Sequence, residues 1–278
     1  MNTLDFKSIL AKSEFTSKDI LEVLAKDEDV IIRAAVAQNP NTPKEVLEIF
    51  VKNEDFFVRG TVARNLNVPK EILEILAKDE NRQVRVYVAE NSNVPKEILE
   101  VLAKDEEYCV RESIALNPKS SKYILEIISK DKDSYVREAV AKNPKTSKKI
   151  LEILAKDEIW EVRESIAENL NVPKEILEIL AKDKTLEVRV SIAQNPNTPK
   201  EIFDNLSKDE DYYVRGSVAF NKITPKEILE ILAKDKVWNV RAAVAKNQKT
   251  PKKILEILAK DEDPDIQRIA SQNPNYES

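Results

Sequence analysis

Apolar residues recur along the chain at helical spacing, and the whole pattern repeats every 26 residues without a break in register. A fixed period of about 20 to 50 residues is the sequence signature of stacked structural repeats. We therefore predict an all-α solenoid of about ten two-helix repeats. The clearest polar column of the repeat is arginine, which recurs as Arg33, Arg59, Arg85, Arg111, Arg137, Arg163, Arg189, Arg215 and Arg241.

The later helix of each repeat is predicted to begin at residues such as 42–45, "TPKE". Threonine is a capping residue, proline suits the first helical position, and glutamate three residues after the cap completes a capping box. The starts at which valine replaces this threonine are predicted to be weaker. The apolar residues that follow form one stripe on a helical wheel: Val46, Leu47, Ile49 and Phe50.

The earlier helix is predicted to start near Asp27, whose carboxylate can cap the first amides and suits the positive end of the helix dipole. Ile32 and Val36 face the core. Asn39 is predicted to end the helix, because asparagine tolerates the left-handed conformation found at many helix ends. We interpret the arginine column as a structural ladder in which each arginine bridges to an aspartate of its own or the next repeat.

The two ends of the chain depart from the pattern. Lys7 and Gln267 stand where the other repeats have arginine. Because solenoids need polar terminal repeats, we predict one elongated domain with capping units at both ends. Its parts are an N-terminal capping repeat at 1–26, nine full repeats at 27–260 and a C-terminal capping half-repeat at 261–278.

The repeat resembles a known family. The segment 32–55, "IRAAVAQNPNTPKEVLEIFVKNED", is similar to the leucine-rich repeat variant, and its first half is similar to the second helix of HEAT repeats. The resemblance implies a right-handed superhelix in which the second helix of each pair is 3₁₀ or α, and the 26-residue unit is long enough for α. The family's founding type holds an iron–sulfur centre on N-terminal cysteines, which this sequence lacks, so no cofactor carries over.

Composition removes several classes of function. The chain has no histidine, two glycines and one cysteine, Cys109, so acid–base catalysis, phosphate-binding loops, disulfides and a cysteine metal site are not expected. We predict a protein that is not an enzyme. Its apolar runs are too short for a signal peptide or a bilayer span, which favours a cytoplasmic location. We also expect a monomer, and the Lys/Glu/Ile-rich composition suits a thermostable protein.

The positions that vary most between repeats are 30, 31, 34 and 38 and their equivalents, which we call the variable face. Its first two columns hold eight of the chain's 16 aromatic residues. Large side chains at positions predicted to be exposed indicate a binding surface, although the position-30 column could instead pack between repeats. The candidate binding residues are Phe56, Phe57, Gly60, Tyr108, Glu112, Tyr135, Glu138, Trp160, Glu161, Glu164, Tyr212, Tyr213, Gly216, Phe220 and Trp238.

Charge on the variable face indicates the class of partner. Three successive repeats carry glutamate in one column, and the face holds seven acidic and four basic residues over the nine full repeats. An acidic centre flanked by aromatic residues favours a basic or amphipathic protein or peptide. The overall net charge of −5 argues against nucleic acid. Two alternatives remain: a HEAT-like nucleic-acid module using the Lys26 and Lys44 columns, and an engineered scaffold with no natural ligand.

Both glycines follow an aromatic doublet, in "EDFFVRG" and "EDYYVRG". Gly60 and Gly216 occupy equivalent positions of their repeats, at three repeats on either side of Glu138. We predict that they form two matching shallow pockets, with chance symmetry as the alternative. Replacing Gly60 by alanine is then expected to weaken partner binding and to raise stability.

Overall fold

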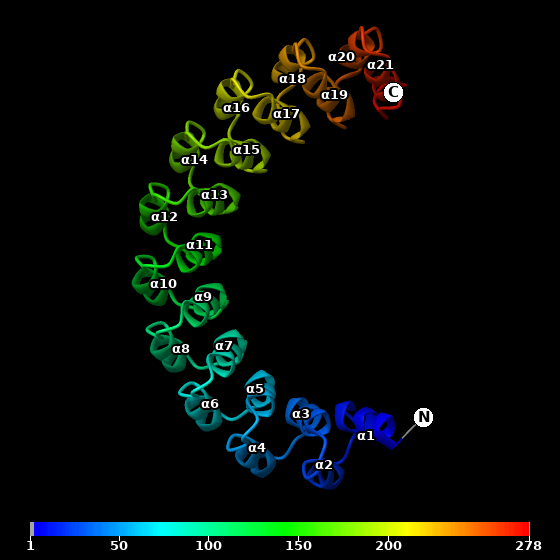
Figure 1. Ribbon diagram of the computed structural model, residues 1–278. Helices are drawn as coiled ribbons and strands as arrows, with labels where there is room; N and C mark the ends of the chain where they lie inside the picture. Colours follow the sequence, from blue (N-terminus) through cyan, green and yellow to red (C-terminus); the bar gives the residue numbers. More distant parts are fainter. Residues whose placement is uncertain (1–2, 278) are drawn as a thin grey trace. The chain divides into compact units, whose positions relative to one another are not determined.

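The computed structural model describes residues 3–277, and all of its regular elements in that range are α-helices (Figure 1). Contacts divide the chain into unit 1, Met1–Lys145, and unit 2, Thr146–Ser278. Unit 1 contains α1 (Thr3–Lys12), α2 (Lys18–Leu24), α3 (Val30–Gln38), α4 (Lys44–Phe50), α5 (Phe56–Arg64), α6 (Lys70–Leu76), α7 (Arg82–Glu90), α8 (Lys96–Leu102), α9 (Tyr108–Leu116), α10 (Lys122–Ile128) and α11 (Ser134–Lys142). Unit 2 contains α12 (Lys148–Leu154), α13 (Trp160–Glu168), α14 (Lys174–Leu180), α15 (Leu186–Gln194), α16 (Lys200–Leu206), α17 (Tyr212–Phe220), α18 (Lys226–Leu232), α19 (Trp238–Lys246), α20 (Lys252–Leu258) and α21 (Pro264–Ser271).

Within each unit the helices form two layers. Consecutive odd-numbered helices pack side by side, and each even-numbered helix packs against the odd-numbered helices next to it in the chain (Figure 1). The core lies between the layers, where the isoleucine, leucine and valine stripes of both helices are buried. The prediction of an all-α repeat solenoid is confirmed. Whether the chain is a single domain stays a prediction.

The even-numbered helices are α-helical, so the 3₁₀ alternative is not realised. The predicted capping box is wrong at the helices that follow proline, because there the N-cap is proline, as at Pro43, and threonine lies outside the helix. In α10 and α12 serine replaces this proline, and the hydroxyls of Ser121 and Ser147 accept from Ile124 N and Ile150 N. The threonine hydroxyl instead donates to a carbonyl of the preceding odd helix, as from Thr198 Oγ1 to Ile192 O at 2.6 Å. A valine at this position therefore loses a bond to the preceding helix and does not lose a cap.

The odd-numbered helices start two residues later than predicted. Asp29 is the N-cap of α3, and its carboxylate accepts a hydrogen bond from Ile31 N at 2.8 Å. Asp27 lies before the helix and accepts from Asp29 N at 3.0 Å and from Lys7 Nζ at 2.6 Å. Because Asp27 binds a cation of the preceding repeat, the capping role passes to the residue two positions later.

Asn39 ends α3 as its C-cap, as predicted, but the left-handed conformation expected there is wrong. Its backbone is extended, with φ −66° and ψ 129°, and among the described residues no non-glycine has a positive φ. Its amide instead donates to Ala11 O and Ser13 O of the preceding repeat, at 2.8 Å each. The asparagine column thus joins neighbouring repeats by bonding carbonyls that a helix end leaves unpaired.

Seven arginines of the predicted ladder bridge to an aspartate of the next repeat. Arg59 Nε and Nη2 donate to the carboxylate of Asp79 in the next repeat at 2.6 and 2.9 Å, while its Nη1 donates to Asn53 O and Glu54 O. Both partners are about nine-tenths buried or more, so each pair is a bidentate bridge inside the repeat junction. The pairs are Arg59–Asp79, Arg85–Asp105, Arg111–Asp131, Arg163–Asp183, Arg189–Asp209, Arg215–Asp235 and Arg241–Asp261.

Other members of the column also make contacts with the backbone. Asn53 stands where other repeats have the partner aspartate, and Arg33 donates to Asp27 O and Glu28 O at 2.8 Å. Arg137 donates to the carbonyls at 131 and 132. Near the C-terminal end, Gln267 keeps the backbone contact with an amide that donates to Asp261 O at 2.7 Å.

Candidate functional site

The four columns of the variable face differ in exposure. The position-38 column is exposed in every full repeat, and the position-31 column is exposed or half-buried. The position-34 column was predicted to be exposed, and this is wrong: Ala34, Gly60, Val86 and Ala242 are buried and the others half-buried. Odd helices pack side by side, so this column lies toward the next helix of the layer and is less exposed than the position-38 column.

The aromatic residues of the face are accessible. In the position-30 column Phe56, Tyr108 and Trp238 are 41 to 53% exposed, while Trp160 and Tyr212 are half-buried. Phe57, Tyr135 and Tyr213 are exposed in the position-31 column, as is Phe220 in the position-38 column. Tyr108 stacks on Tyr135 of the next odd helix, with ring centroids 5.8 Å apart.

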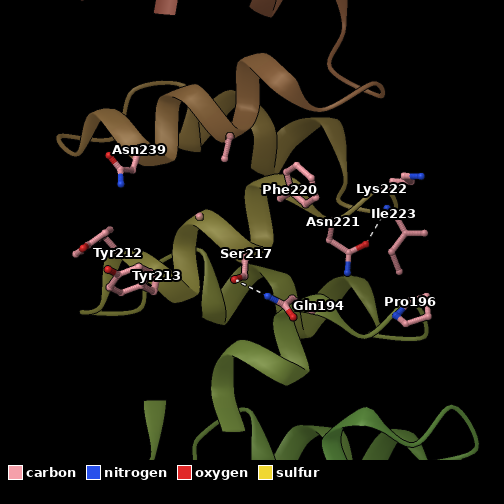
Figure 2. A pocket seen from close by; sticks show the side chains of 12 residues that line it. Gln194, Pro196, Tyr212, Tyr213, Ser217, Phe220, Asn221, Lys222, Ile223 and Asn239 are labelled. Carbon is pink, nitrogen blue, oxygen red and sulfur yellow. Dashed lines mark hydrogen bonds between the residues drawn. The ribbon is translucent and has the colours of Figure 1, made fainter. Parts of the chain in front are cut away.

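A hollow of about 690 Å³ lies along α17 in unit 2 (Figure 2). Tyr212 and Tyr213 stand at one end, with ring centroids 4.3 Å apart, and Phe220 stands at the other. Gly216 lies between them in the floor, where a β-carbon would meet nothing within 4 Å. The flanks are Gln194 and Pro196 before α17, Ser217 and the loop 221–223 of its own repeat, and Asn239 and Ala243 on α19.

The hollow brings together four predicted residues, Tyr212, Tyr213, Gly216 and Phe220, with others that the sequence analysis missed. Gln194 Nε2 donates to Ser217 Oγ at 3.4 Å across the two helices (Figure 2). The Asn221 carboxamide accepts from Ile223 N at 3.1 Å and holds the loop beside the hollow. The sequence did not single out these residues, because small and amide side chains also occupy the equivalent positions of other repeats.

Gly60 does not form a matching pocket. A β-carbon on Gly60 would lie 2.8 and 2.9 Å from Cδ2 and Cε2 of Tyr87, which belongs to the next odd helix, α7. The Arg64 guanidinium lies over the same ring, 3.6 Å from its centroid. The chain therefore fills with its own tyrosine the space that is open at Gly216. The prediction of two equivalent pockets is wrong. Whether the space beside each glycine is filled depends on a residue outside the variable face, which is Tyr87 for Gly60 and Ala243 for Gly216.

The acidic residues divide between the units. Glu112 and Glu138 lie on α9 and α11 of unit 1, and Glu161 and Glu164 lie on α13 of unit 2, all half-buried. Burial raises the pKa of Glu112, and the nearby Asp133 carboxylate adds to the shift. In unit 2, Ser191 Oγ donates to Glu164 at 3.4 Å. A continuous acidic strip stays a prediction.

Several exposed lysines of the even-numbered helices lie beside glutamates. Lys70, for example, lies 3.7 Å from Glu74 in its own helix and 3.7 Å from Glu97 in the next repeat. Lys174 makes the same two kinds of contact with Glu178 and Glu201. This layer is an alternating charge surface, as solvent-facing helices usually present.

In residues 3–277 no three His, Cys, Asp or Glu side chains are grouped so that they could hold a metal ion, and Cys109 is a half-buried free thiol. In the same range no helix has the length and apolar character needed to cross a membrane.

Comparison with known proteins bears on the fold. No protein-family model matches the chain, and no curated protein is significantly similar to it. A solved structure described as a leucine-rich repeat variant with a novel repetitive motif is similar over 80% of this chain and 88% of its own, with TM-score 0.62 and 23% identity. The chain has the fold of a leucine-rich repeat variant. At this identity the likeness concerns the fold alone.

Two further solved structures match with lower scores. Escherichia coli YibA covers 100% of this chain and 98% of its own at TM-score 0.36 and 18% identity. An engineered protein covers 99% and 96% at TM-score 0.16 and 17% identity. Neither score supports an argument about this chain.

Proposed function

We propose that this leucine-rich-repeat-variant solenoid is a non-catalytic scaffold that binds a basic or amphipathic peptide on the variable face of unit 2. The hollow along α17 carries the proposal. It is an apolar depression walled by exposed aromatic side chains, and such depressions rimmed by polar groups are typical of binding sites.

The one charged residue that lines the hollow is Lys222, so the support for a basic partner comes from the neighbouring part of the variable face. In the full repeats of unit 2, the four columns of this face hold Glu161, Glu164, Glu168 and Glu187 against one cation, Lys246. All four glutamates belong to α13 and α15, and α15 packs directly against α17. A peptide that places apolar side chains in the hollow would extend its cationic side chains over these carboxylates. Complementary charge of this kind speeds association and orients the ligand.

The nucleic-acid alternative has less support. Phosphate-binding surfaces need unpaired cations, whereas several lysines of the Lys44 column lie beside glutamates, as in Lys148–Glu175 and Lys200–Glu227. A gel-shift at low salt tests this alternative directly. We expect no retardation of DNA or RNA at micromolar protein.

The proposed function is tested by selection and calorimetry. Short random peptides displayed on phage are selected against the full chain, and we expect enrichment of lysine, arginine and aromatic residues. Binding of a selected peptide is then measured with the double variant Glu161→Gln/Glu187→Gln. Loss of both carboxylates is expected to weaken binding about tenfold at low salt, or about 1.4 kcal/mol.

A matched control removes the same two charges from the other layer. Glu152 and Glu178 are exposed glutamates of α12 and α14 in the same unit, so Glu152→Gln/Glu178→Gln should leave the affinity unchanged. Enrichment of acidic peptides, or equal losses in both double variants, would contradict the proposed function.

A further inference from the structure

Unit 1 contains an internal example of a ring bound at a glycine of the odd layer. The Tyr87 ring of α7 lies against Gly60 of α5, so close that a β-carbon there would overlap its edge at 2.8 Å. Arg64, one helical turn beyond Gly60, covers the ring at 3.6 Å. Gly60 is buried as a result. The geometry shows what this position of the repeat accommodates: a flat aromatic ring held between two helices.

The same position is open in unit 2. Gly216 is the equivalent of Gly60, and Ala243 is the equivalent of Tyr87 on the following odd helix. The space that the tyrosine ring fills in unit 1 is therefore part of the hollow along α17, and Gly216 remains half-buried. Phe220 stands where Arg64 stands, so an aromatic side chain replaces the guanidinium that covers the ring.

We propose that the hollow is a seat for one aromatic side chain of the bound peptide, placed over Gly216 as Tyr87 is placed over Gly60. This inference rests on the proposed function and names the group that anchors the peptide. The ring packs against Phe220 on one side and the Tyr213 ring on the other.

The surroundings favour a planar ring over an aliphatic side chain. Three of the lining side chains, Tyr212, Tyr213 and Phe220, are aromatic, and aromatic pairs gain from offset or edge-to-face contact beyond the area they bury. Gly216 removes the one β-carbon that would hold a ring away from the α17 backbone. Asn239 and Ser217, at the edges, offer hydrogen-bonding groups to a phenol or an indole.

The two glycines provide a direct measurement. A chain labelled with ¹⁵N-glycine gives two backbone amide signals, because the sequence has two glycines, and Gly60→Ala assigns them by removing one. The probe is N-acetyl-tyrosinamide, with N-acetyl-leucinamide as the aliphatic comparison. We expect the Gly216 signal to shift with the tyrosine probe and much less with the leucine probe. The Gly60 signal should stay in place, since Tyr87 already fills its site.

Two variants test the seat in opposite directions, one by filling the open site in unit 2 and the other by emptying the filled site in unit 1. Ala243→Tyr supplies unit 2 with its own ring, and we expect the response of Gly216 to fall at least tenfold. Tyr87→Ala empties the site in unit 1, and we expect Gly60 to begin to respond to the probe. In that variant an unchanged Gly216 signal, in the same spectrum, reports that unit 2 is still folded.

The outcomes separate this inference from the proposed function. If selected peptides bind the variable face but neither they nor the tyrosine probe shift Gly216, the aromatic seat is overturned while the binding function stands. If the tyrosine probe shifts Gly216 and no basic peptide is selected, the seat stands and the basic-peptide function fails. An equal response to the leucine probe, or an undiminished response in Ala243→Tyr, also overturns the seat.

Discussion

Gly60 and Gly216 have nearly identical neighbours in the chain and different surroundings in the structure. Each follows an aromatic doublet and lies in the middle of an odd-numbered helix. What distinguishes them is a residue 27 positions later, which is Tyr87 for one and Ala243 for the other. The local sequence could not reveal this difference, because the deciding contact is made across the repeat junction.

The two glycines are therefore predicted to respond differently to alanine. At Gly216 the new β-carbon meets open space, so Gly216→Ala should stabilise the protein by about 0.5–1 kcal/mol through helix propensity. At Gly60 the same gain is opposed by overpacking against Tyr87, which typically costs about 1–3 kcal/mol. The sequence-based expectation that Gly60→Ala raises stability is thus replaced by the opposite one. Urea unfolding of both variants measures the difference.

A double-variant cycle checks the cause. If the Tyr87 ring is what opposes the new methyl group, Gly60→Ala should become stabilising when it is made in a Tyr87→Ala background. The same cost in both backgrounds would show that the ring is not responsible.

At the scale of the element, each repeat junction is joined by polar side chains that bond to the neighbouring repeat. Asn195 Nδ2 donates to Ala167 O at 2.7 Å and to Asn169 O at 3.4 Å, and its own oxygen accepts from Asn197 N at 2.8 Å. The arginine partners were predictable, because aspartate and arginine recur together and attract one another. The asparagine contacts were not, since a residue at a helix end has an equally good local explanation.

Asn195 is predicted to matter more than its exposed neighbour. Asn195→Ala leaves buried carbonyls without a donor, which typically costs about 1–3 kcal/mol. Asn197→Ala is the matched control in the same loop, because Asn197 is exposed and its amide donates to Leu170 O at 2.7 Å near the surface. The melting temperature of Asn195→Ala should be well below that of the control. Equal melting temperatures would contradict the proposal that Asn195 stabilises the junction between repeats.

At the scale of the whole molecule, the arginine ladder makes stability depend on pH. Burial alone would raise the pKa of Asp183, but hydrogen bonds from Arg163 and from Thr185 outweigh it and lower the pKa below its ordinary value of 3.8. The shift has the same direction and pattern at Asp131, Asp235 and Asp261.

The direction of this pH dependence follows from proton uptake by the folded and unfolded states. Above pH 3.8 the aspartates are ionised in both states and the ladder contributes its full stabilisation. As the pH falls below this value, the unfolded chain binds protons first, so stability is lost until the folded pKa is passed. We expect the melting temperature to fall steeply in this acid range, and less steeply in Asp183→Asn. If the melting temperature of that variant fell equally steeply with acid, Asp183 would not contribute to the pH dependence.

Glu112 should show the opposite dependence. Burial raises its pKa above the ordinary 4.5, so the unfolded chain releases the proton first as pH rises, and stability is lost between 4.5 and the folded pKa. Glu112→Gln is therefore expected to be more stable than the natural chain at neutral pH and similar to it at acid pH. Melting curves at both pH values measure the difference in stability between the two proteins. A difference that does not change with pH would contradict the raised pKa of Glu112.

The sequence alone determined the repeat, its two helices, the core stripes and the arginine ladder. Each of these follows from a period of 26 residues and from side chains whose attraction is strong wherever they meet. It also located the aromatic residues of the variable face, because helical spacing separates them from the core. The fold comparison confirmed the leucine-rich repeat variant architecture that the motif resembled.

Only the tertiary structure decided which positions of that face are open. The position-34 column is buried or half-buried because odd helices pack side by side, and the Gly60 site is filled because Tyr87 reaches it from the next helix. Gly216 lies in an open hollow because Ala243 is too short to do the same. A repeated sequence fixes which residues are equivalent. The space beside each of these residues depends on the size of a side chain in the next repeat, and that size differs between equivalent positions.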